Sequence, residues 1–166
     1  MRENETGHGE SVLTLDSDIV DLERLTAFVD AFCQRETVPA EACSQLQVAL
    51  EELALNVIKY GECEPKKDAI RLAIRREGDE VRAVLCDTGV FFNPLDVPPP
   101  DLTSSVQDRP LGGLGIHLVR NLLESIRYER CEGRNYLYFV KRLNPDSDKA
   151  DPEGETHANR IGDYKS

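Results

Sequence analysis

The stretch VALEELALNVIKYGE, residues 48–62, decides how this chain is interpreted, because it combines an apolar helical pattern with polar residues. Its apolar residues recur at helical spacing, yet Glu51, Glu52 and Asn56 lie in its middle. A carboxylate or an amide that is removed from water costs free energy unless a partner satisfies it. These three residues therefore face either solvent or a ligand.

The composition is that of an acidic globular protein. The chain has 166 residues, of which 40% are hydrophobic, and a formal net charge of -11. This charge argues against binding to nucleic acid or to an anionic membrane, and it favours a protein partner with a basic patch. The sequence has no apolar run of membrane-spanning length, no signal-peptide core, and five cysteines without metal-ligand spacing. We therefore expect a soluble cytoplasmic protein with reduced thiols.

Strand and helix patterns alternate between two polar ends. Residues 1–10 predict a disordered N-terminus and residues 144–166 a flexible acidic tail, so the folded unit is expected at 11–143. Strands joined mostly by hairpins predict a mixed, mostly antiparallel sheet, with three helices on one face: an α+β, two-layer α/β sandwich. In chain order, we expect a strand at 11–17, helices at 17–36 and 39–60, strands at 69–77 and 81–89, a long loop at 90–113, a helix at 113–125, and strands at 125–131 and 134–143.

Several residues mark the ends of the first two helices. Ser17 or Asp18 is suited to cap the first helix, and Pro39 suits the first turn of the second. Gly61 is well placed to end the second helix near Tyr60.

In the second helix, Glu52 and Asn56 are spaced to lie on one face, one turn apart. Lys59 joins the same face, whereas Glu51 points about 100° away. An Asn carbonyl oxygen suits Mg²⁺, which also takes phosphate oxygens, and the neighbouring carboxylate is placed to accept a proton from an attacking hydroxyl. The alternative is that both residues satisfy helix ends or loops in the core.

Two further motifs carry residues suited to the same kind of ligand. Asp87 ends a strand predicted to be central, and its carboxylate could hold an exocyclic amine, with Gly89 freeing the backbone. An ordinary turn is the alternative. Gly112, Gly113 and Gly115 open the third helix, where backbone amides can approach phosphate oxygens. The context of a dinucleotide-binding fold or a P-loop is missing.

Together, and in this order, the three motifs resemble those of the GHKL ATPases, the superfamily of gyrase, the heat-shock chaperone and histidine kinases. Within it, the stretches EELALNVIKYGE and GGLGIHLVRNLLESIRYER are similar to the bacterial anti-sigma-factor serine/threonine kinases, and the resemblance covers about residues 11–143. It implies a Bergerat-type ATP-binding fold. Glu52-x-x-x-Asn56 resembles the N-box, Asp87-Thr88-Gly89 the first glycine box and Gly113-Leu114-Gly115 the second.

The resemblance implies ATP and Mg²⁺ as cofactors and gives a role to each residue. Asn56 would ligate Mg²⁺, and Glu52 would be the general base for a partner's Ser or Thr hydroxyl. Asp87 would receive the adenine amino group, and Gly89 would leave room beside the ring. The phosphates would be held around Gly112, Gly113, Leu114 and Gly115, under a lid formed by residues 93–111.

The chain departs from the family pattern at two positions. Leu111 stands where relatives often carry an Arg, and Arg109 is the nearby residue suited to a γ-phosphate. A Thr that often assists adenine binding is missing, and Asn135 is the nearest polar substitute. We expect His117 and Arg120 of the third helix to be surface residues.

The resemblance implies a kinase that phosphorylates a small STAS-type anti-sigma-factor antagonist and also sequesters a sigma factor. Relatives of this kind often form homodimers. A second hypothesis is a nucleotide-gated binding module that transfers no phosphate, and a third is a structural domain that has lost nucleotide binding. The presence of Glu52 favours the first, because a module that only binds has no need for a base. A sensor histidine kinase is not expected, since its phosphoacceptor His domain is missing.

Overall fold

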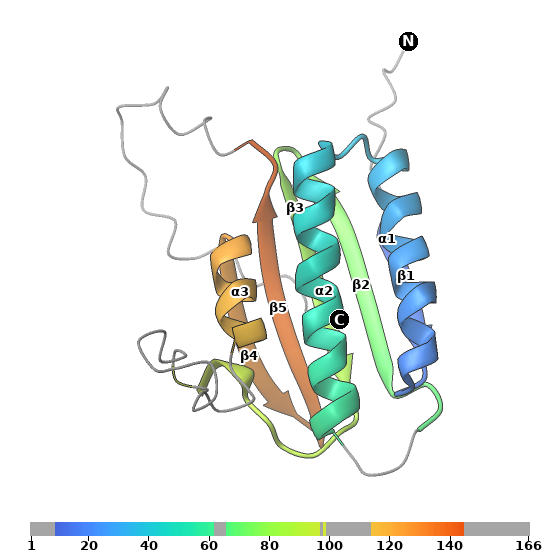
Figure 1. Cartoon of the computed structure of the whole chain (residues 1–166), viewed down its shortest axis with the longest axis vertical. Coiled ribbons are helices and arrows are strands. Elements are labelled where there is room, and N and C mark those ends of the chain that lie inside the picture. Colours follow the sequence, from blue (N-terminus) through green and yellow to red (C-terminus); the bar gives the residue numbers. More distant parts are fainter. Residues whose placement is uncertain (1–8, 62–65, 97, 99–113, 145–166) are drawn as a thin grey trace, which may run out of the picture.

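The computed structural model describes residues 9–61, 66–96, 98 and 114–144, which form a helical layer over a five-stranded sheet (Figure 1). The helices α1, α2 and α3 lie side by side over the same face of the sheet, so the expected two-layer sandwich is confirmed. The strands are β1 (Ser11–Leu15), β2 (Ile70–Glu77), β3 (Glu80–Asp87), β4 (Ser125–Cys131) and β5 (Arg134–Arg142), and the helices are α1 (Leu22–Arg35), α2 (Ala40–Tyr60) and α3 (Leu114–Leu122), with 3₁₀ helices η1 (Ile19–Asp21) and η2 (Pro94–Asp96).

The sheet has the strand order β1-β2-β3-β5-β4. All pairings between the described strands are antiparallel, so the parallel pair that a mixed sheet would contain is not found among them. β3 is the central strand, as predicted, and β1 lies at an edge. The two predicted hairpins are present, with Gly78 at a φ of 59° between β2 and β3 and Gly133 at 79° between β4 and β5.

The core lies between the sheet and the helices because alternate strand residues point toward the helical layer. Fully burying each large aliphatic side chain stabilises the fold by about 1.5–3 kcal/mol. α2 lies between α1 and α3, which places its polar residues at the centre of the molecule. The buried apolar residues include Leu25, Val29 and Phe32 of α1, Leu46, Leu50 and Leu53 of α2, Ile70, Leu72 and Ile74 of β2, Val81 and Leu85 of β3, and Leu137 and Phe139 of β5.

The first two helices begin later than the sequence predicts. Asp18 caps η1, where its carboxylate accepts from the Val20 amide, and α1 begins only at Leu22. The intervening Asp21 is held by the Asp16 amide and by Arg24, and these donors lower its pKa. The hydrogen bonds of Asp18 and Asp21 thus fix a 3₁₀ turn before α1, as is common at helix N-termini. Pro39 is the N-cap residue of α2 and lies just outside its first turn.

Gly61 ends α2 for a reason other than the left-handed cap that the sequence suggests. Its φ is -70°, which is right-handed and open to any residue. Space is the constraint, because a Cβ at Gly61 would lie 2.4 Å from the Val57 carbonyl oxygen. A Cβ at Gly89 would in turn lie 3.0 Å from the Gly61 Cα. The Val90 amide also donates to the Gly61 carbonyl, so the end of α2 packs directly against the segment after β3.

The ends of the chain lie largely outside the described residues. The expected disorder of residues 1–10 and the expected acidic tail at 144–166 therefore stay predictions. No helix in the described part of the chain has the length and apolar content of a membrane span.

Candidate functional site

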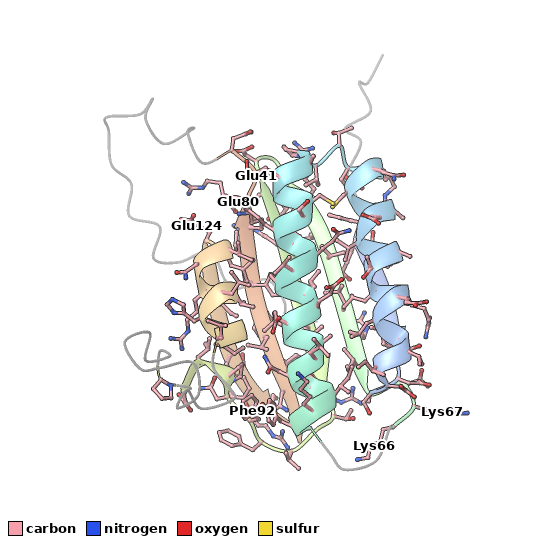
Figure 2. The ribbon with its side chains drawn as sticks, in the orientation of Figure 1. Glu41, Lys66, Lys67, Glu80, Phe92 and Glu124 are labelled. Atoms are coloured by element: carbon pink, nitrogen blue, oxygen red, sulfur yellow. The ribbon has the colours of Figure 1, made fainter. Side chains whose placement is uncertain are left out.

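A pocket opens at the end of β3, between the C-terminal half of α2 and the sheet. Its walls are mostly apolar and contain a few convergent polar side chains, which is the usual composition of a small-molecule site. Phe92, on the outer wall, lies beside the C-terminal end of α2 and packs against the ring of Tyr60 (Figure 2). The lining residues are Leu53, Asn56, Val57, Gly61, Asp87, Val90, Phe92, Pro94, Asn135 and Leu137.

Asn56 is the residue of α2 whose polar group needs a partner at this pocket. Its Nδ2 is buried, and no hydrogen-bond acceptor for it is found among the described residues. A buried donor without a partner costs about 1–3 kcal/mol. Because Asn56 lines the pocket, a ligand with acceptor oxygens would remove that cost. This arrangement fits the ligand-facing interpretation of Asn56 and not the alternative of a satisfied core residue.

Glu52 lies one turn before Asn56 and faces the start of α3. A Cβ on Gly115 would lie only 2.1 Å from the Glu52 Oε2, so this close approach requires glycine. The fold thus brings the first and third motifs of the sequence into contact. Within the described part of the chain, the Glu52 carboxylate makes no hydrogen bond or ion pair that would occupy its oxygens. It is half-buried and available to accept a proton.

Glu51, the adjacent carboxylate, has a different role. Its Oε1 accepts a hydrogen bond of 2.8 Å from the Thr26 hydroxyl, which ties α2 to α1. The two acidic neighbours therefore separate as the helical rotation predicts, one toward α1 and the other toward α3. Lys59 is exposed near the end of α2.

Asp87 is a deeply enclosed polar residue of the pocket, with only 5% of its surface exposed. Both hydrogen bonds that it receives from described residues reach Oδ1, from the Gly89 amide and from Asn135 Nδ2, each at 2.8 Å. Burial raises the pKa of Asp87, while these two donors and the Arg130 charge act in the opposite direction. Oδ2 remains as the acceptor that a ligand amine can use.

Gly89 allows the pocket to close around Asp87. A Cβ at this position would lie 2.9 Å from Asp87 Oδ1 and would also press on the backbone of Gly61. The two glycines therefore let the loop after β3 lie close to the end of α2. This role is steric and differs from the backbone freedom that the sequence suggests, because Gly89 is not among the glycines with a positive φ.

The structure describes only some of the remaining predicted site residues. Leu114 begins α3 and is 62% exposed. His117 is half-buried. Arg120 is exposed as expected, yet its guanidinium donates to the Leu95 carbonyl and so links α3 to η2. Arg109, Gly112, Gly113 and most of the expected lid, from residue 99 to residue 111, lie outside the described residues.

Sequence reasoning named Asn135 only as a substitute for a missing Thr and did not identify its partners. Asn135 is 4% exposed and bonds to Asp87, Val90, Tyr128 and Arg130. Tyr128 and Arg130 lie two residues apart on β4 and therefore point to the same face. This alternation just before the hairpin is the sequence signal that could have found them.

The oxygen atoms available at this pocket suit a magnesium ion that is coordinated mainly by the phosphates of a bound nucleotide. Among the described residues, no group of three or more His, Cys, Asp or Glu side chains could hold a metal ion. Mg²⁺ characteristically takes one or two protein oxygens and completes its shell with phosphate oxygens and water. The side chain of Asn56 is suited to supply one of these oxygens at the pocket.

Comparison with known proteins places this arrangement in a family. Residues 15–141 match the family described as histidine kinase-like ATPase domain. That span contains the pocket and all the polar side chains described above.

Several curated relatives carry kinase names. The chain is 28% identical over 102 residues to the serine/threonine-protein kinase BtrW of Bordetella bronchiseptica, covering 61% of this chain and 72% of that protein. It is 26% identical over 127 residues to the serine-protein kinase RsbW of Bacillus cereus, covering 73% of each. A structure of the RsbU and RsbW domains of a Mycobacterium tuberculosis protein superposes with a TM-score of 0.60 at 18% identity, over 81% of this chain and 32% of that one. The chain spans about a third of that structure, and the likeness is one of fold.

Proposed function

The chain belongs to the histidine kinase-like ATPase domain family, and from this premise we propose that it is an ATP-dependent protein serine/threonine kinase. The observation that carries the proposal is that Asn56 and Asp87 line one pocket, while Glu52 lies one helical turn from Asn56 and faces Gly115. Asn56 has an unsatisfied buried donor, Asp87 has an available acceptor, and Glu52 lies one helical turn from Asn56. These groups are suited to phosphate, to an amine and to a hydroxyl proton.

Asp87 and Gly89 would bind the adenine. The exocyclic amino group would donate to Asp87 Oδ2, while the apolar wall formed by Leu53, Val57 and Leu137 would cover the ring. Desolvation inside the pocket strengthens such a hydrogen bond, and it would make the site reject bases without a donor at that position.

Asn56 would hold the phosphate end of the nucleotide. Its Oδ1 would ligate Mg²⁺, and its Nδ2 would donate to a phosphate oxygen. The bound Mg²⁺ would neutralise the charge that develops on the phosphate oxygens during transfer. We also assign phosphate contacts to Gly112, Gly113, Leu114 and Gly115 and a γ-phosphate contact to Arg109.

Glu52 would act as the general base. It would take the proton from a Ser or Thr hydroxyl of the partner as that oxygen forms its bond to the γ-phosphorus. The bond from the γ-phosphorus to the bridging oxygen would break, and ADP would leave. The position of Glu52 against Gly115 aims the carboxylate toward the start of α3, where the resemblance puts the phosphates.

The partners we propose are those of an anti-sigma-factor kinase. Two of the relatives described above are named serine-protein or serine/threonine-protein kinases. The substrate would be a STAS-type antagonist protein, and a sigma factor with basic DNA-binding regions would suit the net charge of -11. We propose that the protein acts in the cytoplasm and forms a homodimer.

The experiment that tests the function uses radiolabelled ATP with candidate antagonist proteins encoded beside this chain. Wild-type protein should label a partner Ser or Thr, and Glu52→Gln should abolish labelling while still binding a fluorescent ATP analogue. Glu51→Gln is the matched control, because the amide oxygen can still accept from Thr26, and labelling should persist.

Two other results would replace the proposal. Nucleotide binding without labelling of any partner would make the chain a nucleotide-gated binding module. No Mg²⁺-dependent nucleotide binding by the wild type would leave a structural domain. Labelling that is unchanged in Glu52→Gln would remove Glu52 from the role of base.

A further inference from the structure

We propose that Arg130 is a positioning residue that acts through Asn135 to orient Asp87 and thereby makes the pocket select an adenine over a 6-oxopurine. The inference rests on the proposed nucleotide-binding function and adds a residue that lies outside the three sequence motifs described above. It depends on a line of side chains that crosses three adjacent strands at the floor of the pocket.

The line follows from the register of the sheet. Asp87 on β3 lies directly opposite Asn135 on β5, and Asn135 lies directly opposite Arg130 on β4. All three residues point to the helical side of the sheet, where the pocket opens. A charge at the edge strand is thus connected to the carboxylate at the centre by a single amide.

Asn135 uses all of its hydrogen-bonding capacity in this line. Its Nδ2 donates to Asp87 Oδ1 at 2.8 Å and to the Val90 carbonyl at 3.0 Å. Its Oδ1 accepts from the Tyr128 hydroxyl at 2.8 Å and from Arg130 Nη1 at 2.7 Å. Since an amide offers two donors and two lone pairs, Asn135 has nothing left for a ligand. Its role at this site is therefore to hold Asp87.

Arg130 fixes which way the Asn135 amide faces. A flipped amide would direct its NH₂ group at the guanidinium and its oxygen at the Asp87 carboxylate, and both contacts would be repulsive. Arg130 Nη1 also donates to the Gly89 carbonyl at 2.9 Å, so the same side chain holds the loop beside Asp87. The guanidinium thus sets both the donor and the backbone that occupy Asp87 Oδ1.

The consequence is a carboxylate that presents an acceptor to the ligand. An ionised Asp87 attracts the amino group of adenine and repels the carbonyl oxygen that hypoxanthine and guanine carry at the same ring position. A protonated Asp87 would instead donate to that oxygen. Burial raises the pKa of Asp87 and favours the protonated form, and the positive charge of Arg130 opposes this shift.

Among the described residues, the other ionisable groups that act on this line are Tyr128 and Asp96. Tyr128 on β4 donates its hydroxyl to Asn135, and Asp96 of η2 acts on Tyr128. α2 contributes the uncharged Asn56 to the pocket wall. Among the described residues, Arg130 is thus the positively charged side chain that lowers the pKa of Asp87.

The test compares the binding of ATP and of inosine triphosphate, with Mg²⁺, to Arg130→Gln, Arg130→Lys and the wild type between pH 5.5 and 8.5. Arg127→Gln is the matched control, because Arg127 lies on the same strand but pairs with Glu129 and stacks on Tyr138 on the opposite face. Thermal unfolding is measured for every variant.

We expect Arg130→Gln to weaken ATP binding by about tenfold, the equivalent of about 1.4 kcal/mol, and to weaken inosine triphosphate binding less. The ratio of the two affinities should therefore fall. Binding of ATP requires the ionised carboxylate, so it is lost as the pH decreases through the pKa of Asp87. Loss of Arg130 raises that pKa, and the decline should begin at a higher pH. Arg130→Lys should recover part of the ratio, and Arg127→Gln should match the wild type.

Equal losses for both nucleotides, or an unchanged ratio and pH profile, would overturn the inference even where the melting temperature falls. The failure of the proposed function looks different, since the wild type itself would then bind neither nucleotide. A wild type that binds ATP and transfers phosphate, with Arg130 variants of unaltered selectivity, would refute only the role of Arg130.

Discussion

Asp87 and Asn135 face each other across β3 and β5, and the Asn135 amide donates to Asp87 Oδ1 over 2.8 Å. Because the Gly89 amide reaches the same oxygen, one side of the carboxylate is occupied by the protein and the other is left to the pocket. The buried acid is therefore oriented before any ligand arrives.

The first prediction concerns the charge of Asp87. Burial raises its pKa above the value in the unfolded chain, so the ionised group costs stability, and this cost develops as the pH rises from about 4 toward neutrality. Asp87→Asn keeps an Oδ1 acceptor for both donors and removes the charge. We expect its stability relative to the wild type to improve as the pH rises from about 4 to 7. Urea unfolding across this range measures it.

The same variant should lose nucleotide binding, because the amide would direct an NH₂ group at the adenine amine. If the stability of Asp87→Asn instead fell relative to the wild type as the pH rises, the ionised Asp87 carboxylate would have more stabilising partners than the structure indicates. Retained ATP affinity would remove Asp87 from adenine recognition.

The second prediction separates folding from binding at Asn56. Asn56→Ala removes a buried donor without a described partner, so we expect the free energy of unfolding to change by less than about 1 kcal/mol. Mg²⁺-dependent nucleotide binding should fall by at least about tenfold. Calorimetric titration and thermal unfolding measure the two effects. Gln45→Ala, which removes only a solvent-exposed hydrogen bond to Glu41 on the same helix, should leave both unchanged.

The third prediction uses the contact between Gly115 and Glu52. In Gly115→Ala the new methyl group would meet the carboxylate at 2.1 Å, so the side chain of Glu52 must move. We expect phosphate transfer to decrease by about 100-fold or more, with little loss of stability, because the atom that must move is the end of a flexible side chain. Labelling assays and thermal unfolding give both values.

A double variant checks that cause. Gly115→Ala combined with Glu52→Ala keeps the new methyl group but removes the carboxylate that it would meet. The double variant should therefore be more stable than the sum of the two single changes in unfolding free energy predicts. Strict additivity would indicate that Gly115 is required for another reason, such as the approach of the backbone to phosphate.

The fourth prediction concerns Gly89. A methyl group there would lie 2.9 Å from Asp87 Oδ1 and 3.0 Å from the Gly61 Cα, and both neighbours are held in place. Gly89→Ala should therefore destabilise the protein by about 1–3 kcal/mol and weaken nucleotide binding. Unfolding and binding curves test this together. A stabilising effect, the usual result of reducing the freedom of the unfolded chain, would show that the loop adapts.

Local patterns predicted most of the fold. Strand alternation and the Gly78 and Gly133 turns gave the hairpins, because these depend on neighbours in sequence. The predicted start of α1 was wrong because the amide of Asp16 and the side chain of Arg24 hold Asp21 in a turn. The spacing of apolar residues does not reveal this turn. The constraint on Gly61 was missed because it depends on the exact backbone geometry at the helix end, where a Cβ would meet the Val57 carbonyl oxygen. The constraint on Gly89 was missed because it arises from Gly61, which is 28 residues away by their numbers.

The candidate site divides in the same way. Helical spacing alone places Glu52 and Asn56 together and sends Glu51 elsewhere, and the contact of Glu51 with Thr26 agrees. The Arg130–Asn135–Asp87 line needs the order of three strands, which the sequence of hairpins does not determine. Residues that act through tertiary register are therefore visible only once the sheet is assembled.

The contact between Gly61 and Gly89 has a mechanical consequence. It joins the end of the helix that carries Asn56 to the backbone that carries Asp87, so the two polar ends of the pocket form one rigid frame. The distance between Asn56 and Asp87 therefore determines the length of ligand that can contact both residues. A molecule that supplies only one end gains nothing from the other, whereas a molecule of the right span engages both without bending the protein.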